Sequence, residues 1–337
     1  MVVFIHSHNI GDVSMAGNAV LENGYSSFFQ DFISYGISLT AVPLFFLISG
    51  YLFYFNFKGT KKEFITKFKK RFKSLTIPYL FWSTGVVLLF FVLQLIPGFQ
   101  SVFGSKLIID YSFNELLTKL FLNPIPFQLW FLRDLILLVV LSPIIYWLIR
   151  LTGFYFIIIL FITWVFNFDY VIFENRSILF FSLGAILSIN KTNLLLIDFS
   201  RYYRLYSFLW FALVLIKTIL LFNEYQDVLI MNILQISSIL FGVLSIWSLY
   251  DFFFKDKDLT NSKFYKYSSF SFFIFVFHVP IFSIIRRGLF IFLGKSEFSS
   301  LIIYMAVPFI TILLGISLGG FLKQSVPKFY NVITGSR

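Results

Sequence analysis

The chain contains no cysteine, and only three of its 337 residues are histidine. The first absence excludes a disulfide framework, a thiolate nucleophile and a metal site built on Cys. His6 and His8 lie far along the chain from His278, with no HExxH or comparable spacing. We therefore expect no metal site.

Charge is scarce as well. Charged residues make up 13 % of the chain and hydrophobic residues 58 %, with a mean hydropathy of +0.86. A soluble domain of this size needs roughly a quarter charged residues to cover its surface. This composition excludes a soluble globular enzyme. It predicts an all-α, polytopic integral membrane bundle of about ten transmembrane helices that forms a single domain over residues 1–337.

Apolar runs long enough to cross a bilayer recur along the whole chain, without an internal repeat. Nine full spans are predicted at 34–55, 75–96, 129–149, 153–168, 176–189, 203–222, 228–249, 268–292 and 299–322. A tenth, partial span is the opening MVVFIHSH. Because it is too short to cross, we expect that the recorded start is internal and that about ten residues precede it.

The basic residues predict the orientation. The segment 56–74 carries eight Lys or Arg residues against one acid, Glu63, and is therefore assigned to the cytoplasm. Alternation then places 190–202, 250–267 and the tail from Lys323 inside. The segments 9–33, 97–128, 169–175, 223–227 and 293–298 fall outside, and both termini are expected in the cytoplasm. The net charge of +11 is thus a signal of topology and of attraction to anionic lipids, and nucleic acid is not an expected partner.

Apolar residues recur within 56–74 at a spacing typical of an amphipathic helix lying on the inner interface. Thr76-Ile77-Pro78 then suits the start of a new helix, because Pro is tolerated in the first turn. The 32 residues from Pro97 to Gln128 have the size of a lid or a re-entrant loop.

Ionisable residues within the apolar spans are the candidates for chemistry, because each costs about 2.5–3.5 kcal/mol to insert. His6 is either a general base for a hydroxyl nucleophile or an interfacial His leaving the membrane. His278 lies roughly 15 Å into its span, where it either bonds between helices or lines a polar path loosened by Pro280.

Arg133 and Asp134 point about 100° apart on one helix, so we expect each to find a partner on another helix. Structural pairing is slightly favoured over direct catalysis for these two. Arg286, Arg287 and Lys217 are interpreted as snorkelling to head groups.

Five stretches, in order, resemble the acyltransferase-3 family of membrane O-acyltransferases, in the branch of bacterial surface-polysaccharide O-acetyltransferases. They are VVFIHS, PLFFLISGYLF at 43–53, KKRFKSLTIPYLFW at 69–82, PFQLWFLRDLI at 126–136 and YSSFSFFIFVFHVPI at 267–281. Together they cover the chain almost end to end. No single stretch is specific for the family. Five of them in the family's order, in a chain with its basic loops on the inner side, are fairly specific.

The resemblance implies transfer of an acyl group, usually acetyl, from cytoplasmic acyl-CoA to a sugar hydroxyl. Acetyl-CoA would be the donor substrate, and no permanently bound cofactor is expected. The essential His of the family corresponds to His6. The family's basic pair for acyl-CoA follows R-x-x-R. Here Arg71 matches the first position and Ser74 occupies the second. The neighbouring Lys70 or Lys73 could take over the role of the second arginine.

Residues Trp130, Arg133, Asp134 and His278 are the candidates to line the substrate cavity. Arg133 or the Trp130 indole N–H is a candidate to stabilise the oxyanion. The expected location is the bacterial cytoplasmic membrane, with lipids, the glycan acceptor and envelope polysaccharide assembly proteins as partners.

Two rival functions stay open at this point. A polysaccharide or lipid-linked sugar transporter also uses membrane-buried His, Arg and Asp, although inverted repeats would be expected and none is found. A non-catalytic relative that binds or exports its ligand through the same fold is the second, and Ser74 at the usual second arginine position keeps it open.

Overall fold

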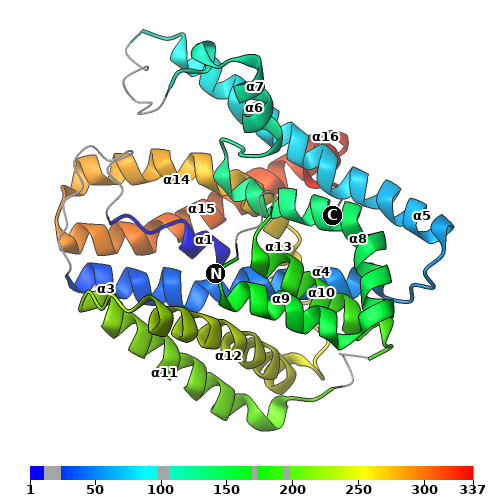
Figure 1. Cartoon of the computed structure of the whole chain (residues 1–337). Helices are drawn as coiled ribbons and strands as arrows, with labels where there is room; N and C mark the ends of the chain where they lie inside the picture. Colours follow the sequence, from blue (N-terminus) through cyan, green and yellow to red (C-terminus); the bar gives the residue numbers. More distant parts are fainter. Residues whose placement is uncertain (11–23, 98–105, 169–172, 193–196, 337) are drawn as a thin grey trace. The chain divides into compact units, whose positions relative to one another are not determined.

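The computed structural model describes residues 1–10, 24–97, 106–168, 173–192 and 197–336, and within these ranges all regular structure is helical (Figure 1). The predicted outer segments 9–33, 97–128 and 169–175 and the inner segment 190–202 each include residues outside these ranges. The α-helices are α1 Val2–Ile5, α3 Tyr25–Asp31, α4 Ala41–Tyr54, α5 Lys61–Arg71, α6 Ile77–Gln94, α7 Phe113–Phe121, α8 Trp130–Thr152, α9 Phe154–Val165, α10 Asn175–Ile189, α11 Tyr203–Phe222, α12 Val228–Phe254, α13 Lys263–Ser268, α14 Ser271–Leu293, α15 Glu297–Ser325 and α16 Pro327–Thr334.

Each of the nine predicted full spans coincides with a helix. Six continuous helices of the described chain are long and apolar enough to cross a membrane: Tyr25–Tyr54, Lys61–Gln94, Phe127–Thr152, Ser200–Phe222, Val228–Phe254 and Glu297–Ser325. A seventh span is α14 if its two halves, which meet at a 58° bend, are counted together. The helices α9 and α10 are apolar but shorter, with 12 and 15 residues. The all-α polytopic membrane bundle is thereby confirmed.

The region between the basic segment and the membrane differs from the prediction. A helix is present in 56–74, namely α5, and α6 begins at Ile77 with Pro78 in its first turn, as predicted, but the two helices are not separate. Instead a π-helical turn, Phe72–Thr76, joins α5 to α6 in one continuous helix of 34 residues. Pro78 stands in the first turn of α6, where a missing N–H is tolerated, and the wider π-turn just before it absorbs the irregularity.

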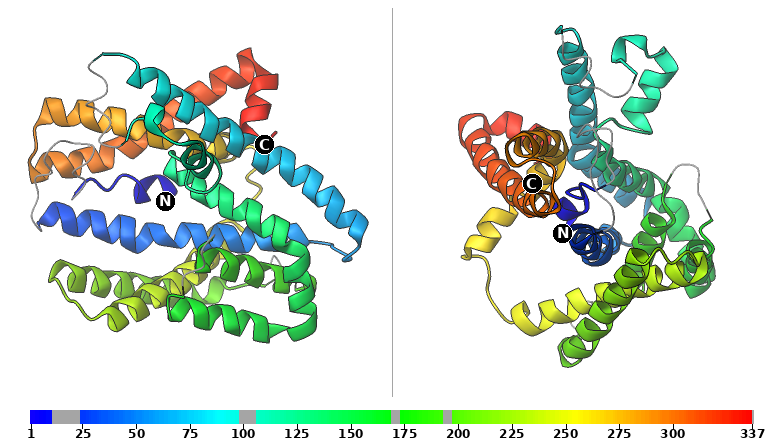
Figure 2. Two further views of the ribbon diagram at one scale, coloured as in Figure 1. Left: turned by 45° about the horizontal axis from the view of Figure 1, so that its top comes forward. Right: turned by 90° about the vertical axis from the view of Figure 1, so that its left-hand side faces the viewer.

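The described chain forms two compact units, each made of separated segments. Unit 1 holds residues 1–5, 27–69 and 137–266, and unit 2 holds 6–26, 70–136 and 267–337. In unit 1, α4 packs on α10 and α11 packs along α12 (Figures 1 and 2). Gly50 of α4 and Gly184 of α10 make the contact between these two helices possible, since a Cβ on either would overlap the backbone of the other helix.

In unit 2, the long helices α14 and α15 lie side by side and α16 folds onto α6 (Figure 2). The Trp82 indole N–H donates to Ile333 O at 3.0 Å, which fixes α16 against α6. Gly335 ends α16 with a φ of +70°, and a side chain there would meet the backbone of Ser74. The C-terminal helix is thus held beside the π-turn that follows the basic residues Lys70 and Arg71.

Candidate active site

His6 follows α1 directly, and its backbone is fixed by hydrogen bonds on both sides. On the N-terminal side, within unit 1, Ser34 Oγ donates to Phe4 O at 2.7 Å. Ser34 lies in the π-helical turn Phe32–Ile37, a kind of irregularity that is frequent at functional sites. On the other side, Asn9 Nδ2 donates to Ser300 O at 3.1 Å and Ser300 Oγ donates to Asn9 Oδ1 at 2.6 Å.

Arg286 provides a further link within unit 2, because its guanidinium donates to His8 O at 3.2 Å. Its side chain is buried, so the prediction that it snorkels to head groups is wrong. The same prediction for Lys217 is wrong as well. Lys217 is buried in unit 1 and donates to Tyr35 O at 2.8 Å and, through a second bond, to Gln235 Oε1. In both cases a buried acceptor of the bundle replaces the lipid head group.

The His6 ring lies between two other rings. It stacks on His278, with centroids 5.3 Å apart and planes 30° apart. It also meets Phe127 edge to face at 4.8 Å. The sequence placed these three residues in separate stretches of the chain, and the fold of unit 2 brings them together.

His278 is fully buried and its tautomer follows from its contacts. Its Nδ1 lies 2.6 Å from Phe275 O and 3.2 Å from Ile274 O, and carbonyl oxygens only accept, so Nδ1 carries the proton. Nε2 of the neutral ring is then a hydrogen-bond acceptor, and it has no partner within the described part of the chain. His278 therefore holds the stacked face of His6 and keeps one lone pair available.

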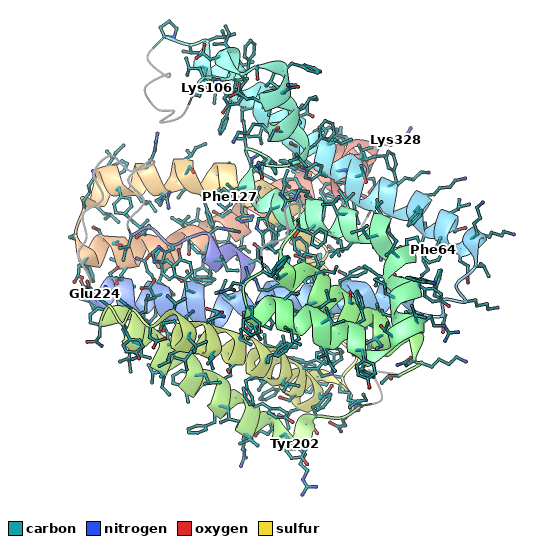
Figure 3. All side chains as sticks on the ribbon, viewed as in Figure 1. Phe64, Lys106, Phe127, Tyr202, Glu224 and Lys328 are labelled. Atoms are coloured by element: carbon teal, nitrogen blue, oxygen red, sulfur yellow. The ribbon has the colours of Figure 1, made fainter. Side chains whose placement is uncertain are left out.

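Phe127 is also one of the residues that line a cavity of about 440 Å³. Aromatic and polar side chains share its wall, a composition and a size typical of sites for small ligands. The lining residues are Phe90, Gln94, Lys106, Ile108, Tyr111, Lys119, Asn123, Pro124, Ile125, Phe127, Trp130 and Arg133. Lys106 and Phe127, labelled in Figure 3, come from the segment before α7 and from the turn before α8.

Hydrogen bonds attach α7, which forms one wall of this cavity, to α6. Tyr79 Oη donates to Phe121 O and Ser83 Oγ donates to Leu120 O, both at 3.0 Å. At the other end of α6, Gln94 Oε1 accepts from the Ile108 N–H at 2.7 Å. The described part of the predicted loop 97–128 is therefore attached to α6 by hydrogen bonds, and seven of its residues outside α7 line the cavity together with Lys119 of α7.

The sequence does carry a signal for α7 that the prediction did not use. Ser112 and Glu115 form a capping box, with the Ser112 N–H donating to Glu115 Oε2 at 2.7 Å. Glu115 also accepts from Lys106 Nζ at 2.9 Å through both carboxylate oxygens. These bonds hold the pKa of Glu115 at about 2, so the carboxylate that balances Lys106 stays ionised at neutral pH.

Arg133 and Asp134 pair directly with each other, which the prediction of a partner on another helix for each did not include. Arg133 Nη2 lies 2.8 Å from Asp134 Oδ1 and Nε lies 3.1 Å from the same oxygen. The guanidinium also donates to Leu122 O. Arg133 does therefore also reach another helix, because Leu122 is the C-cap residue of α7. The 100° between adjacent residues did not prevent the pair, because the long Arg side chain reaches back to a carboxylate that is fully buried.

The predicted site residues thus fall into four groups. Trp130 and Arg133 line the cavity, Asp134 anchors Arg133 from behind, and His278 stacks on His6. Lys70, Arg71 and Lys73 are not among the lining residues, and they follow one another on α5 and the π-turn, with Lys70 and Lys73 exposed and Arg71 half-buried. Phe127, Lys119 and Ser300 are contributions that the prediction missed.

Comparison with known proteins identifies the family of the chain. The Acyltransferase domain family matches residues 1–320. The succinoglycan biosynthesis protein ExoH of Rhizobium meliloti (strain 1021) is 24 % identical over 344 residues, which cover 100 % of this chain and 89 % of that protein. No solved structure matches the chain. With helices that can span a membrane along most of its length and a family match over 320 residues, the chain belongs to the acyltransferase-3 family of membrane acyltransferases.

Proposed function

We propose that this protein transfers an acyl group, acetyl in the simplest case, from cytoplasmic acyl-CoA to a hydroxyl of a cell-envelope or exported glycan. One observation carries the proposal: Phe127 contacts the His6 ring at 4.8 Å and also lines the 440 Å³ cavity. A titratable base thus lies one aromatic ring away from a cavity of the size of a sugar residue or two. The printed name of ExoH, which concerns succinoglycan biosynthesis, supports a glycan as the acceptor.

In the proposed reaction the acceptor hydroxyl oxygen attacks the thioester carbonyl carbon. His6 accepts the hydroxyl proton as the new C–O bond forms. The tetrahedral intermediate then collapses, the C–S bond breaks, and the CoA thiolate receives the proton from His6. The products are the O-acyl glycan and CoA thiol. His278, stacked on His6 and held through Nδ1, is a positioning residue for the base.

The donor is proposed to bind at the basic residues of unit 2. Acyl-CoA carries several phosphate charges, and Lys70, Arg71 and Lys73 offer three cations within one helical turn. Ser74 at the second basic position of the family pattern leaves Arg71 as the planar, bidentate donor of this group. The location is proposed to be the bacterial cytoplasmic membrane, with both termini and this basic segment on the cytoplasmic side.

The test is glycan O-acylation in a deletion strain that carries wild-type protein, His6→Gln or His8→Gln. Loss of the base is expected to lower the transfer rate by about 10²–10⁴-fold, while His8→Gln, which removes the neighbouring imidazole, retains transfer. The amount of each variant inserted in the membrane is measured by immunoblot. Equal acylation by wild type and His6→Gln would contradict the role of His6. Loss of the surface glycan itself on deletion, with no change in acylation per glycan, would favour a transporter.

A further inference from the structure

The charges around the cavity do not balance. Three cations line it, Lys106, Lys119 and Arg133, and its lining residues include no Asp or Glu. Carboxylates behind the wall neutralise two of the three. Lys106 is paired with Glu115 at 2.9 Å, and Arg133 is paired with the buried Asp134 at 2.8 Å.

Lys119 is the lining cation that has no such carboxylate among the described residues. It lies half-buried on α7, one turn after Glu115, at a spacing that would normally favour an i,i+4 pair. The Glu115 oxygens, however, are taken by Lys106 Nζ and by the Ser112 N–H. Within the described part of the chain no hydrogen bond or ion pair engages the Lys119 ammonium. The cavity therefore presents one uncompensated positive charge to its contents.

The rest of the wall fits a sugar ring. Phe90 and Trp130 are aromatic side chains of the lining, a type against which the apolar C–H side of a sugar can pack, and the Asn123 amide can form hydrogen bonds with hydroxyls. Lys119 is a point charge with three donors, suited to one anionic group among hydroxyls. A phosphate or pyrophosphate with more charge is better matched by an Arg fork, but the one Arg here is already occupied.

We infer that the acceptor residue seated in this cavity is an acidic sugar, and that Lys119 binds its carboxylate. That this sugar is the acceptor rests on the proposed function. Its binding does not, because binding of the acidic sugar requires no acyl donor. Lys119 thus acts as the residue that selects a charged over a neutral sugar.

The experiment measures binding of two disaccharides to the purified full chain in phosphatidylcholine nanodiscs, by calorimetry and without donor. The probes are cellobiouronic acid and cellobiose, which differ by a carboxylate in place of a CH₂OH group. We expect the acid to bind about tenfold more tightly, the size of one charge-assisted hydrogen bond, and less so at high salt. Lys119→Gln should abolish this difference and leave cellobiose binding unchanged, and Lys119→Arg should retain it. The matched control, Lys328→Gln on α16, should behave as wild type.

Several results would overturn the inference: equal binding of the two sugars by wild type, binding of neither at millimolar concentration, or a preference that survives in Lys119→Gln. Displacement of both sugars alike by phosphatidylglycerol in the nanodisc, with no preference between them, would assign Lys119 to lipid head groups. Failure of the acyl transfer is distinguishable, because a protein that prefers the acidic sugar through Lys119 but acylates no glycan keeps this site and loses only the proposed function.

Discussion

Buried charges in this protein are held by short, specific contacts. Asp134 is fully buried with Arg133 against it, Arg286 is bonded to the carbonyl of His8, and Lys217 to the carbonyl of Tyr35. A charge inside a membrane bundle is stable only if a partner replaces water. Each contact also fixes a backbone or side chain next to the proposed chemistry or the bundle core, so these residues are expected to contribute to both stability and geometry.

The Arg133–Asp134 pair gives a test at this scale. Asp134→Asn keeps the side-chain volume but leaves the Arg133 guanidinium without its counter-charge. We expect a loss of about 3 kcal/mol, the low end for breaking a buried pair. It is measured as a fall in the midpoint of thermal unfolding in detergent, or as fewer molecules inserted and folded.

The double variant Arg133→Gln with Asp134→Asn is the control for this pair. Because it removes both charges, its loss of stability is expected to be smaller than the sum of the losses measured for Arg133→Gln alone and Asp134→Asn alone. Strictly additive losses would show that the two side chains do not stabilise each other.

Among elements, the contact of α4 with α10 depends on two glycines. Gly50 faces the backbone of Phe181, and Gly184 faces the backbone of Leu47 and Tyr51. The helices therefore approach backbone to backbone, the arrangement that small residues permit in membrane bundles. Neither helix can shift locally to admit a methyl group, because the obstacle is main chain rather than a flexible side chain.

Gly184→Ala tests this contact. The added methyl must separate α4 from α10, and we expect a destabilisation of about 1–3 kcal/mol, as for other overpacked cores. The matched control is Gly85→Ala in α6, where nothing lies within 4 Å of the added atom. That change is expected to be neutral or to stabilise by up to about 1 kcal/mol, through helix propensity. Thermal unfolding of both variants in the same detergent decides the matter, and equal effects would refute the close approach.

At the scale of the whole molecule, orientation in the membrane follows from charge. The basic segment that contains α5 is predicted on the cytoplasmic side and α7 on the outer side. The chain offers a direct way to test this, because it contains no cysteine and single cysteines can be introduced without removing any other.

Two exposed positions serve for the test, Lys62 on α5 and Asn114 on α7. A membrane-impermeant maleimide is expected to label Asn114→Cys in intact spheroplasts and Lys62→Cys only after the membrane is opened. The wild-type chain, which has no thiol, is the blank. The reverse order of labelling would show that the chain has the opposite orientation. The proposed donor and acceptor sides of the membrane would then be exchanged.

The positions of the spans could be predicted from sequence, whereas the partners within the bundle could not. Hydropathy is a sum over neighbours along the chain, so the nine full spans coincide with helices even where Phe154–Val165 and Asn175–Ile189 are short. The continuity of α5 with α6 was not predicted, because it depends on the π-turn Phe72–Thr76, which residue types alone do not specify. The Arg133–Asp134 pair and the burial of Arg286 were also missed, since side-chain reach and acceptor position depend on packing.

The sequence by itself determined the class of protein, because a chain with 13 % charged residues cannot cover a water-facing surface and must bury its apolar runs in lipid. It also singled out His6 and His278 as buried ionisable groups, through the cost of placing them there. Only the tertiary structure decided that these two rings stack, that Phe127 both contacts His6 and lines a cavity, and that Lys119 is the lining cation without a carboxylate partner among the described residues. The two ring contacts join residues more than a hundred positions apart, and their distances are set by helix packing. The state of Lys119 joins residues near in sequence, but it depends on which donors the Glu115 carboxylate accepts from in the folded chain.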